Sequence, residues 1–394
     1  MTEPAQSKEP IAEEFTIGSG AFLHSLLSRV GIAHSDKEGI RLRIIITFLL
    51  TFVPLLVLSA MQGLAVGHSV HVPFLFDISE LVRYLFVVPL LISCETFIDP
   101  WLKKVVQYLR EHLVDAQDQE RFSAIVQHHL RLRNSDFLEF SLLILVFFWQ
   151  WVDVSTHAPV VSTWHLLPGG NQPSYAFNYY IYLAKPLVRF IWLRWLLRYL
   201  VWSLFLIRLQ KLPLKLLPTH PDRHGGLLFV STGHTKFAVL AFAFAIQAAG
   251  ILAEQIIFEG KTLYSFRYVI MGITFIMAII ILSPLVAFTS KLMDAKRHGL
   301  FDYGALANKH AALFKEKWID NFDQNKDSLL GAADVSSLAD MNGSYDVVKD
   351  MSVCLISKDN VIALLIAVLL PFTPLLLTVY PFDELLKHFI KAIM

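Results

Sequence analysis

The chain is poor in cysteine and in charged residues. Cys94 and Cys354 are the two cysteines among 394 residues, and neither belongs to a CxxC pair, so a disulfide framework is excluded. Charged residues make up 17% of the chain, below the roughly 25% that is usual in soluble domains, whereas hydrophobic residues make up 55%. This balance predicts an integral membrane protein.

Signatures of recognised catalysis are missing as well. The sequence contains no GxSxG nucleophile elbow, no GxGD intramembrane aspartate motif and no phosphate loop ending in GK[ST]. This argues against ATP-driven transport by the chain alone and disfavours an enzyme. The net charge of +1, without a nucleic-acid-binding motif, predicts no nucleic-acid partner, and no pattern predicts a cofactor.

Seven apolar windows are long enough to cross a bilayer, which needs about 20 helical residues. They lie at 44–66, 81–98, 137–156, 184–207, 237–258, 267–290 and 361–380. Lysine and arginine are missing from 67–80 and 157–183 but frequent in 99–136 and 208–236. Since short cytoplasmic loops carry these cations in excess, the N-terminus is predicted to be cytoplasmic. The fold class is therefore an all-α, polytopic transmembrane helix bundle.

The span count fixes the expected organisation of the chain. We expect a cytoplasmic segment at 1–43, six spans within 44–290, a cytoplasmic helical insertion at 291–360, and a last span with a C-terminal amphipathic helix at 361–394. Apolar residues recur at helical spacing between charges over 101–133, which predicts amphipathic cytoplasmic helices. We expect these helices to pack on the cytoplasmic span ends or lie in the headgroup layer, with an oligomer interface or a gate lever as the alternative.

The last window leaves an alternative open. It contains Pro371 and Pro374, which favour a kinked helix or a re-entrant segment that returns to the cytoplasm. Six full spans with both termini inside the cell are then the alternative to seven.

The fourth window contains four cations, namely Lys185, Arg189, Arg194 and Arg198. A central arginine costs about 2.5–3.5 kcal/mol on insertion scales, so these side chains are expected to face protein or water. Helical geometry places the last two on roughly the opposite side of the helix from the first two, which excludes a single cationic stripe.

Acidic residues of neighbouring windows are the expected partners of these cations. Asp153 and Glu254 lie near outer span ends, whereas Glu95 and Glu139 lie near inner ends, which leaves Arg194 without a carboxylate at its own depth. Buried ion pairs that fix the bundle are one interpretation, and a polar pathway or anion site centred on Arg194 is the other. The pathway candidates are Lys185, Arg189, Arg194, Arg198, Glu95 and Glu254.

A second group of polar residues lies in the segment PTHPDRHGGLLF at 218–229. His220, Asp222, Arg223 and His224 form a candidate site for an ion or an anionic group at the cytoplasmic mouth. Proline before Asp222, a carboxylate that can accept from a backbone amide two residues on, and two following glycines also fit a rigid structural turn. Both interpretations stay open.

A calcium-loop pattern occurs once. Asp323, Asn325, Asp327 and Asp334 occupy ligand positions of the template, but Ser328 replaces the turn glycine and the last ligand is Asp in place of Glu. A solvated turn in which an aspartate caps the next helix is favoured over calcium binding, and the metal content is left unknown.

Two short segments carry a family resemblance. HPDRHGGL, from His220 to Leu227, and SSLADM, from Ser336 to Met341, resemble segments of uncharacterised bacterial polytopic membrane proteins. The resemblance implies a multi-pass protein of the bacterial inner membrane and implies no activity.

The sequence thus favours an oligomeric ion channel or a secondary transporter for small ions, with a cation-lined intramembrane helix. Its expected partners are the lipid bilayer, small ions and further copies of the chain. A membrane-embedded enzyme or lipid-headgroup handling protein built on the His220 loop is the first alternative, and a non-conducting sensor or scaffold is the second.

Overall fold

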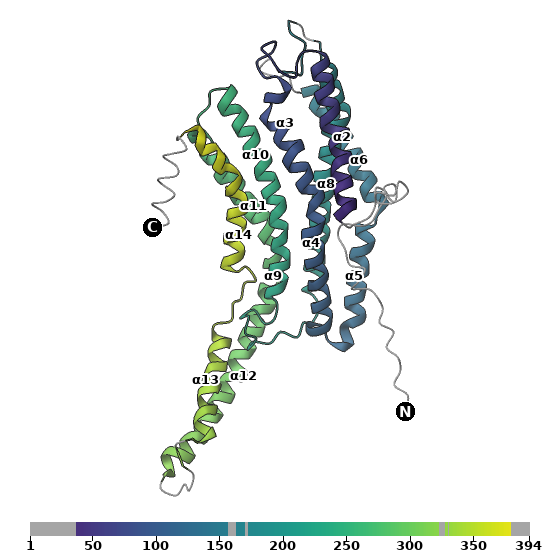
Figure 1. Ribbon diagram of the computed structural model, residues 1–394. Helices are drawn as coiled ribbons and strands as arrows, with labels where there is room; N and C mark the ends of the chain where they lie inside the picture. Colours follow the sequence, from purple (N-terminus) through teal and green to yellow (C-terminus); the bar gives the residue numbers. More distant parts are fainter. Residues whose placement is uncertain (1–36, 157–162, 170–171, 323–327, 330, 380–394) are drawn as a thin grey trace.

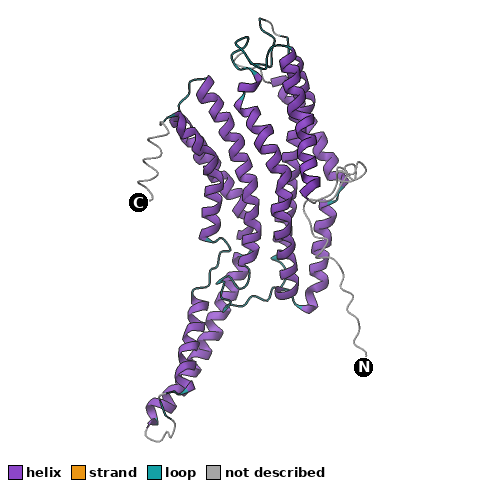
Figure 2. Ribbon diagram, viewed as in Figure 1, coloured by secondary structure: helices purple, strands orange, loops and turns teal. Residues whose placement is uncertain are grey.

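The computed structural model describes residues 37–156, 163–169, 172–322, 328–329 and 331–379. Helices make up most of these residues, and no β-sheet occurs among them (Figure 2). The predicted all-α helix bundle is confirmed.

Seven helical segments in the described ranges are long and apolar enough to cross a membrane. They are Glu38–Met61, Ile78–Leu113, Ala116–Asp153, Tyr175–Leu209, Leu228–Phe258, Leu263–Val286 and Lys358–Thr378. Each predicted window overlaps one of them, so the protein is a multi-pass integral membrane protein. Several segments exceed the roughly 20 residues that a bilayer requires and must extend beyond it.

The second segment shows why the segments are longer than the windows. Helix α3 (Ile78–Val82), a π-helical turn (Arg83–Val87) and α4 (Val88–Tyr108) follow one another without a break, and a second π-helical turn continues to Leu113. Apolar residues beyond the predicted end at 98, including Leu102, Val105 and Val106, are buried in the main hydrophobic core. Residues 101–113 therefore prolong the second span, and only α5 (Gln119–Arg133) is a separate helix here.

Helices α2 (Lys37–Met61), α6 (Asp136–Thr156) and α8 (Lys185–Leu209) lie on one side of α4, with α5 below α6 (Figure 1). A short helix, α7 (Tyr175–Tyr179), and a π-helical turn (Tyr180–Ala184) lead directly into α8. On the other side lie α10 (Ala238–Phe258), α11 (Arg267–Val286) and α14 (Lys358–Leu369). A core of buried aliphatic and aromatic side chains joins the two sides through α4, α8 and α10.

Helix α10 approaches the start of the second segment closely. A Cβ added at Gly250 would lie 3.2 Å from Cβ of Val82, so the glycine allows the two backbones to pack together. Small residues Ala243, Ala245 and Ala249 are buried on the same helix. This packing fixes α10 against α3, where a polar cluster described below is located.

Helices α12 (Thr289–Lys315) and α13 (Ala333–Lys349) form a hairpin that projects from one end of the bundle (Figure 1). We call this the hairpin end. Near the tip, Lys317 Nζ and Trp318 Nε1 donate to Asp334 Oδ2 at 2.8 and 3.0 Å. Asp334 lies in the first turn of α13 and does not cap it, because the N-cap residue is Ala332. The other three calcium-loop candidates, Asp323, Asn325 and Asp327, lie outside the described residues.

The last segment changes its helix type halfway. The α-helical part of α14 ends at Leu369, and a 3₁₀ helix continues from Leu370 to Thr378 through Pro371 and Pro374. Each proline removes a backbone donor, which accounts for the loss of the α-helical pattern. The segment is nevertheless long and apolar enough to cross a membrane.

Candidate functional site

The first two cations of the fourth window are bound to α6. Lys185 Nζ contacts Asp153 Oδ2, and Arg189 Nη2 lies 2.9 Å from the same oxygen. Arg189 Nη1 also donates to Gln150 Oε1 at 2.8 Å. The expected outer ion pair is therefore present, and its geometry is that of a structural clamp between α6 and the start of α8.

Arg194 does have a carboxylate partner, contrary to the sequence-based expectation. Its Nε lies 3.0 Å from Oε1 of Glu139, whose side chain is 6% exposed. The depth assignment was wrong because the helical segment of α8 begins at Tyr175 and not at 184. Arg194 therefore lies 19 residues after the start of its helical segment, level with Glu139 in the first turn of α6.

Two arginines bind one carboxylate beside this pair. Arg198 Nη1 lies 2.9 Å from Glu95 Oε1, and Arg43 Nη1 lies 2.9 Å from Glu95 Oε2. The three side chains come from α8, α2 and α4, and each is no more than 15% exposed. Arg43 is absent from the sequence-based candidates because it precedes the first predicted window by one residue.

These charged residues form one end of a cavity of about 950 Å³ between α2, α4, α6 and α8. We call it the α2–α8 cavity. The charged residues at this end are Arg43, Glu95, Asp136, Glu139, Arg194 and Arg198. The remaining wall is almost entirely apolar. It is formed mainly by Ile46, Leu50, Leu91, Ile92, Phe140, Leu143, Val146, Phe147, Leu183, Leu187, Phe190 and Ile191.

The cavity is elongated along the helices. On α6 its lining runs from Asp136 to Phe147, and along the π-helical turn and α8 from Tyr182 to Arg198, which correspond to about 16 and 24 Å of helix. Several apolar lining residues are exposed, among them Phe140 at 63% and Phe147 at 58%. The cavity is therefore open on the flank of the bundle, where an apolar surface faces hydrocarbon.

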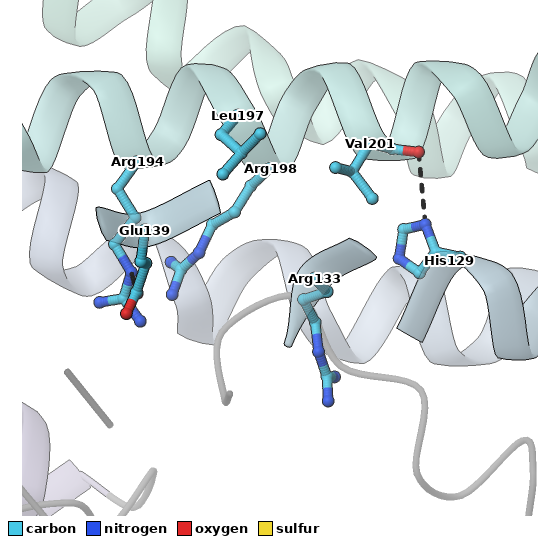
Figure 3. Close-up of a pocket in the computed structure, with 7 residues that line it drawn as sticks. All are labelled: His129, Arg133, Glu139, Arg194, Leu197, Arg198 and Val201. Atoms are coloured by element: carbon cyan, nitrogen blue, oxygen red, sulfur yellow. Dashed lines mark hydrogen bonds and ion pairs between the residues drawn. The ribbon is translucent and has the colours of Figure 1, made fainter. Parts of the chain in front are cut away.

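A small pocket adjoins the charged end and adds residues of α5 (Figure 3). Arg194 and Arg198 leave α8 toward the same side, and the Glu139 carboxylate lies beside the Arg194 guanidinium (Figure 3). Arg133 contributes a further guanidinium from the end of α5. Four arginines thus lie with two buried or part-buried glutamates at this end, and Asp136 is exposed in the first turn of α6.

Arg43 keeps unused donors. Its Nε and Nη2 are buried and have no hydrogen-bond partner among the described residues. A buried donor without an acceptor costs about 1–3 kcal/mol, and more when the group is charged. An anion entering the cavity would supply that acceptor if the Arg43 side chain turned toward it.

The predicted loop site is arranged differently. Oδ1 of Asp222 accepts from the backbone amides of His224 at 2.8 Å and Gly226 at 3.1 Å, and Oδ2 accepts from the amide of Leu228 at 3.1 Å. His220 Nδ1 lies 2.8 Å from the same Oδ1. Both oxygens of the Asp222 carboxylate are therefore bound by groups of its own loop, which is the arrangement that the rigid-turn interpretation expects.

The other loop residues point to the same role. Arg223 has a positive φ of 56° and its guanidinium is 59% exposed, 3.6 Å from Asp350. Its carbonyl accepts from the amide of Ser352 at 2.8 Å, which ties the loop to the segment after α13. His224 Nδ1 lies 2.7 Å from the carbonyl oxygen of Asp222. These contacts join the loop to itself and to the base of the hairpin.

The electrostatics of Asp222 follow from these contacts. Burial alone would raise its pKa, but the hydrogen bonds from three backbone amides and from His220 outweigh burial, and the pKa is lowered from its usual value. Asp222 therefore remains a carboxylate at neutral pH. No cluster of three or more His, Cys, Asp or Glu side chains suited to a metal ion occurs among the residues that the structure describes.

Glu254 lies apart from the α2–α8 cavity. It is half-buried on α10, within electrostatic range of Asp77 and Glu80 at the end of the bundle opposite the hairpin. The structure therefore divides the six pathway candidates among three places. Arg194, Arg198 and Glu95 meet at the charged end of the cavity, Lys185 and Arg189 meet at Asp153, and Glu254 joins a separate acidic cluster.

Comparison of the chain with models of protein families, with curated proteins and with solved structures finds no match. The functional argument below therefore depends on the geometry and chemistry of the site alone.

Proposed function

We propose that this integral membrane protein binds an amphiphile with an anionic headgroup, laterally from the bilayer, in the α2–α8 cavity. The proposal is based mainly on how the lining of the cavity changes along its length, from a cluster of arginines at one end to an apolar wall over the rest. A lipid or a fatty acid has the same division. The proposal takes up the lipid-headgroup alternative and moves it from the His220 loop to the cavity.

The position of the charged end supports a headgroup site. Arg43 is about two turns from the start of α2, and Glu139 is in the first turn of α6. Residues near the ends of spanning helices lie at the level of lipid headgroups. In the proposal the arginine cluster lies at this level, where an anionic headgroup reaches it without entering the hydrocarbon core.

The chemistry of the cluster favours a phosphate or a carboxylate. Guanidinium groups form bidentate hydrogen bonds to both anions, and these charge-assisted bonds are about twice as strong as neutral ones. Glu95 and Glu139 hold the arginines in place without cancelling all their charge. Each such bond contributes about 1.5–3 kcal/mol, which corresponds to a preference of about tenfold or more for an anionic headgroup.

The apolar wall matches the tail. Cavities of about 300–1,000 Å³ lined mainly by hydrophobic and aromatic side chains are typical ligand sites, and the α2–α8 cavity falls in this range. Its elongated shape follows the helix axes, which is also the direction of acyl chains in a bilayer. A compact small ion would gain no favourable contact from such an apolar wall.

Ion conduction, assembly into oligomers and location in a bacterial inner membrane stay predictions. The anion pathway centred on Arg194 loses its main argument, because Glu139 is paired with that residue. Amphiphile binding needs neither flux nor a second copy of the chain.

The test is a binding experiment on the purified full-length protein in detergent. Native mass spectrometry would follow retention of phosphatidylglycerol, oleate and zwitterionic phosphatidylcholine at matched concentrations. We expect both anionic amphiphiles to be retained in preference to phosphatidylcholine, and their relative affinity separates a phospholipid from a free fatty acid as the ligand. Equal retention of all three lipids would overturn the proposal.

Two variants and one control sharpen this test. Arg43→Gln should lower affinity for anionic lipid about tenfold, since it removes a guanidinium at the charged end. Arg41→Gln is the matched control, because Arg41 is exposed on the same helix and does not line the cavity. Leu143→Trp fills the apolar part and should weaken binding of all three amphiphiles. If Arg41→Gln and Arg43→Gln have the same effect, the headgroup site is wrong.

A further inference from the structure

Helix α12 has an apolar face that α13 does not cover. One side of α12 packs on α13, where His310 Nε2 lies 3.0 Å from Ser337 Oγ and a Cβ added at Gly304 would lie 3.6 Å from Cε2 of Tyr345. On another side Phe301 is 71% exposed. The hairpin projects beyond the end of the bundle (Figure 1), and it is not among the described segments suited to cross a membrane. Hydrocarbon therefore does not account for this exposed face.

The exposed face has the spacing of a coiled-coil seam. It is formed by Phe301, Ala305, Asn308 and Ala312, which we call the α12 seam, and all four are exposed. Steps of four, three and four residues keep a seam turned toward a second helix, and here they confine the four side chains to an arc of about 60°. The polar residues His298 and Lys315 occupy the next positions of the same spacing at either end. The seam thus covers about three turns of α12.

A second copy of the chain is the occupant that suits this seam. Copies that enter a membrane in one orientation extend their hairpins on the same side, so their α12 helices run parallel. In a parallel pair with two-fold symmetry, each seam residue lies opposite the same residue of the other copy. Phenylalanine and alanine pack against themselves, and the amide of Asn308 offers both a donor and an acceptor to its counterpart. An asparagine within an apolar seam specifies register in this way.

The charges beside the seam fit the same partner. Arg297 and Asp302 lie on opposite flanks of the seam, and both are exposed. In a parallel coiled coil, a flanking residue of one helix meets the residue five positions later on the other helix. Arg297 of each copy therefore meets Asp302 of the partner subunit, which gives two ion pairs of opposite charge.

These two residues do not pair within their own chain. Neither Arg297 nor Asp302 forms an ion pair with any of the described residues. Five residues apart on one helix, they also lie on different faces, since helical neighbours are three or four residues apart. Their complementarity consequently becomes useful when a second α12 lies alongside. A seam of three turns is weak in solution, but confinement to one membrane raises the effective concentration of the second copy.

We infer that the α12 seam binds the α12 seam of a second copy of the chain, parallel and in register, with Arg297 of each copy paired to Asp302 of the partner subunit. The contact leaves the α2–α8 cavity untouched. It is independent of the amphiphile proposal and is tested separately from it.

Cysteine cross-linking of the full-length protein in proteoliposomes tests the inference. Cys354→Ser provides the background, since Cys94 is buried. In that background Asn308→Cys should form disulfide-linked dimers under mild oxidation, because an in-register parallel pair places the two thiols opposite each other. Ala339→Cys is the matched control. Ala339 is exposed on α13 and lies outside the seam, so its variant should stay monomeric at the same ratio of protein to lipid.

Reversal of the flanking charges tests the register. Added to Asn308→Cys, either Arg297→Asp or Asp302→Arg creates two like-charge contacts between the copies, and the equilibrium yield of dimer should fall by about tenfold. The double variant with both reversals recreates two opposite-charge pairs and should recover the yield. Because the two residues do not pair within one helix, the recovery reports a contact between copies.

Three outcomes would overturn the inference. They are the absence of Asn308→Cys dimers, an equal yield of dimers from Ala339→Cys, and a double charge variant that stays as weak as the single variants. All substituted seam and flank residues are exposed, so the fold does not depend on them. An unchanged midpoint of thermal unfolding in each variant checks this point.

Discussion

The Asp222 loop and the charged end of the α2–α8 cavity contain similar residues in opposite states. In the loop, both oxygens of Asp222 accept hydrogen bonds from backbone amides a few residues away. At the cavity, Arg43 is bound to Glu95 through one nitrogen, and two further nitrogens have no partner within the described chain. The first arrangement satisfies its polar groups within the loop, whereas the second leaves two donors of Arg43 unpaired among the described residues.

This difference teaches that a dense group of polar residues in the sequence does not by itself mark a binding site. The His220 loop became a candidate because its polar residues lie close together in the sequence. The cavity residues, in contrast, are scattered over four helices and more than 150 positions. The two regions differ in whether their hydrogen-bond donors and acceptors are already paired within the protein. The predictions below test this distinction.

The largest effect is expected from Asp222→Ala. Removal of the carboxylate leaves three backbone amides without their acceptor, and a hydrogen bond to a charged group contributes about 1.5–3 kcal/mol. We expect a clear drop in the midpoint of thermal unfolding, followed by tryptophan fluorescence, with lipid affinity unchanged in the folded fraction. An unchanged midpoint combined with altered lipid binding would make the loop a functional site instead.

Arg43→Gln should give the reverse pattern. Glu95 keeps Arg198 as its partner after the substitution, so the pair does not become an isolated buried charge. We expect the unfolding midpoint to stay within a few degrees of the wild-type value while affinity for phosphatidylglycerol falls about tenfold. A variant that unfolds early and binds lipid normally would show that Arg43 is structural.

Acid should weaken the loop. The folded-state pKa of Asp222 is lowered, so its carboxylate stabilises the folded protein above the unfolded value of 3.8, and that stability is lost as pH falls through the lower folded value. The wild type should therefore lose more thermal stability below pH 3.8 than Asp222→Asn does. Parallel unfolding scans of both proteins, from pH 6 downward, provide the measurement, and identical slopes would contradict it.

The smallest effect is expected from Arg223→Gly. A left-handed backbone costs a residue with a Cβ about 1–2 kcal/mol, and glycine removes this strain at the expense of a more flexible unfolded chain. The exposed contact with Asp350 contributes little. We expect a change within about 1 kcal/mol by chemical unfolding, and Arg223→Ala, which keeps the strain, is the control. A large loss of stability in both variants would show that the guanidinium stabilises the fold by more than its exposed contact with Asp350.

The spans and two of the ion pairs could be predicted from the sequence. Apolar runs identify spanning helices because the bilayer requires about 20 apolar residues, and the pairing of Arg198 with Glu95 and of Lys185 with Asp153 follows from their order along the spans. The partner of Arg194 was not predicted, because its helix begins earlier than the apolar window. This earlier start shifts every depth assigned to residues along the helix. An apolar window does not show where the helix that contains it begins or ends.

The cavity could not be predicted in this way. Arg43 and Glu95 are separated by 52 residues, and no local pattern connects them. The start of α3 did leave a signal, because Asp77 and Glu80 have the spacing of a capping box at the start of a helix. The signal was missed because these residues lie in a segment interpreted as a loop.

The hairpin of α12 and α13 is mounted on the Asp222 loop. A Cβ at Gly299 of α12 would lie 2.6 Å from Cβ of Pro218, so the helix touches the loop at this point almost without clearance. Between Gly299 and Asp320 the helix extends about 30 Å, so a tilt of about 10° at its base would displace the tip by about 5 Å. A force applied to the tip would therefore act with a long moment arm on the small turn that the Asp222 hydrogen bonds hold together.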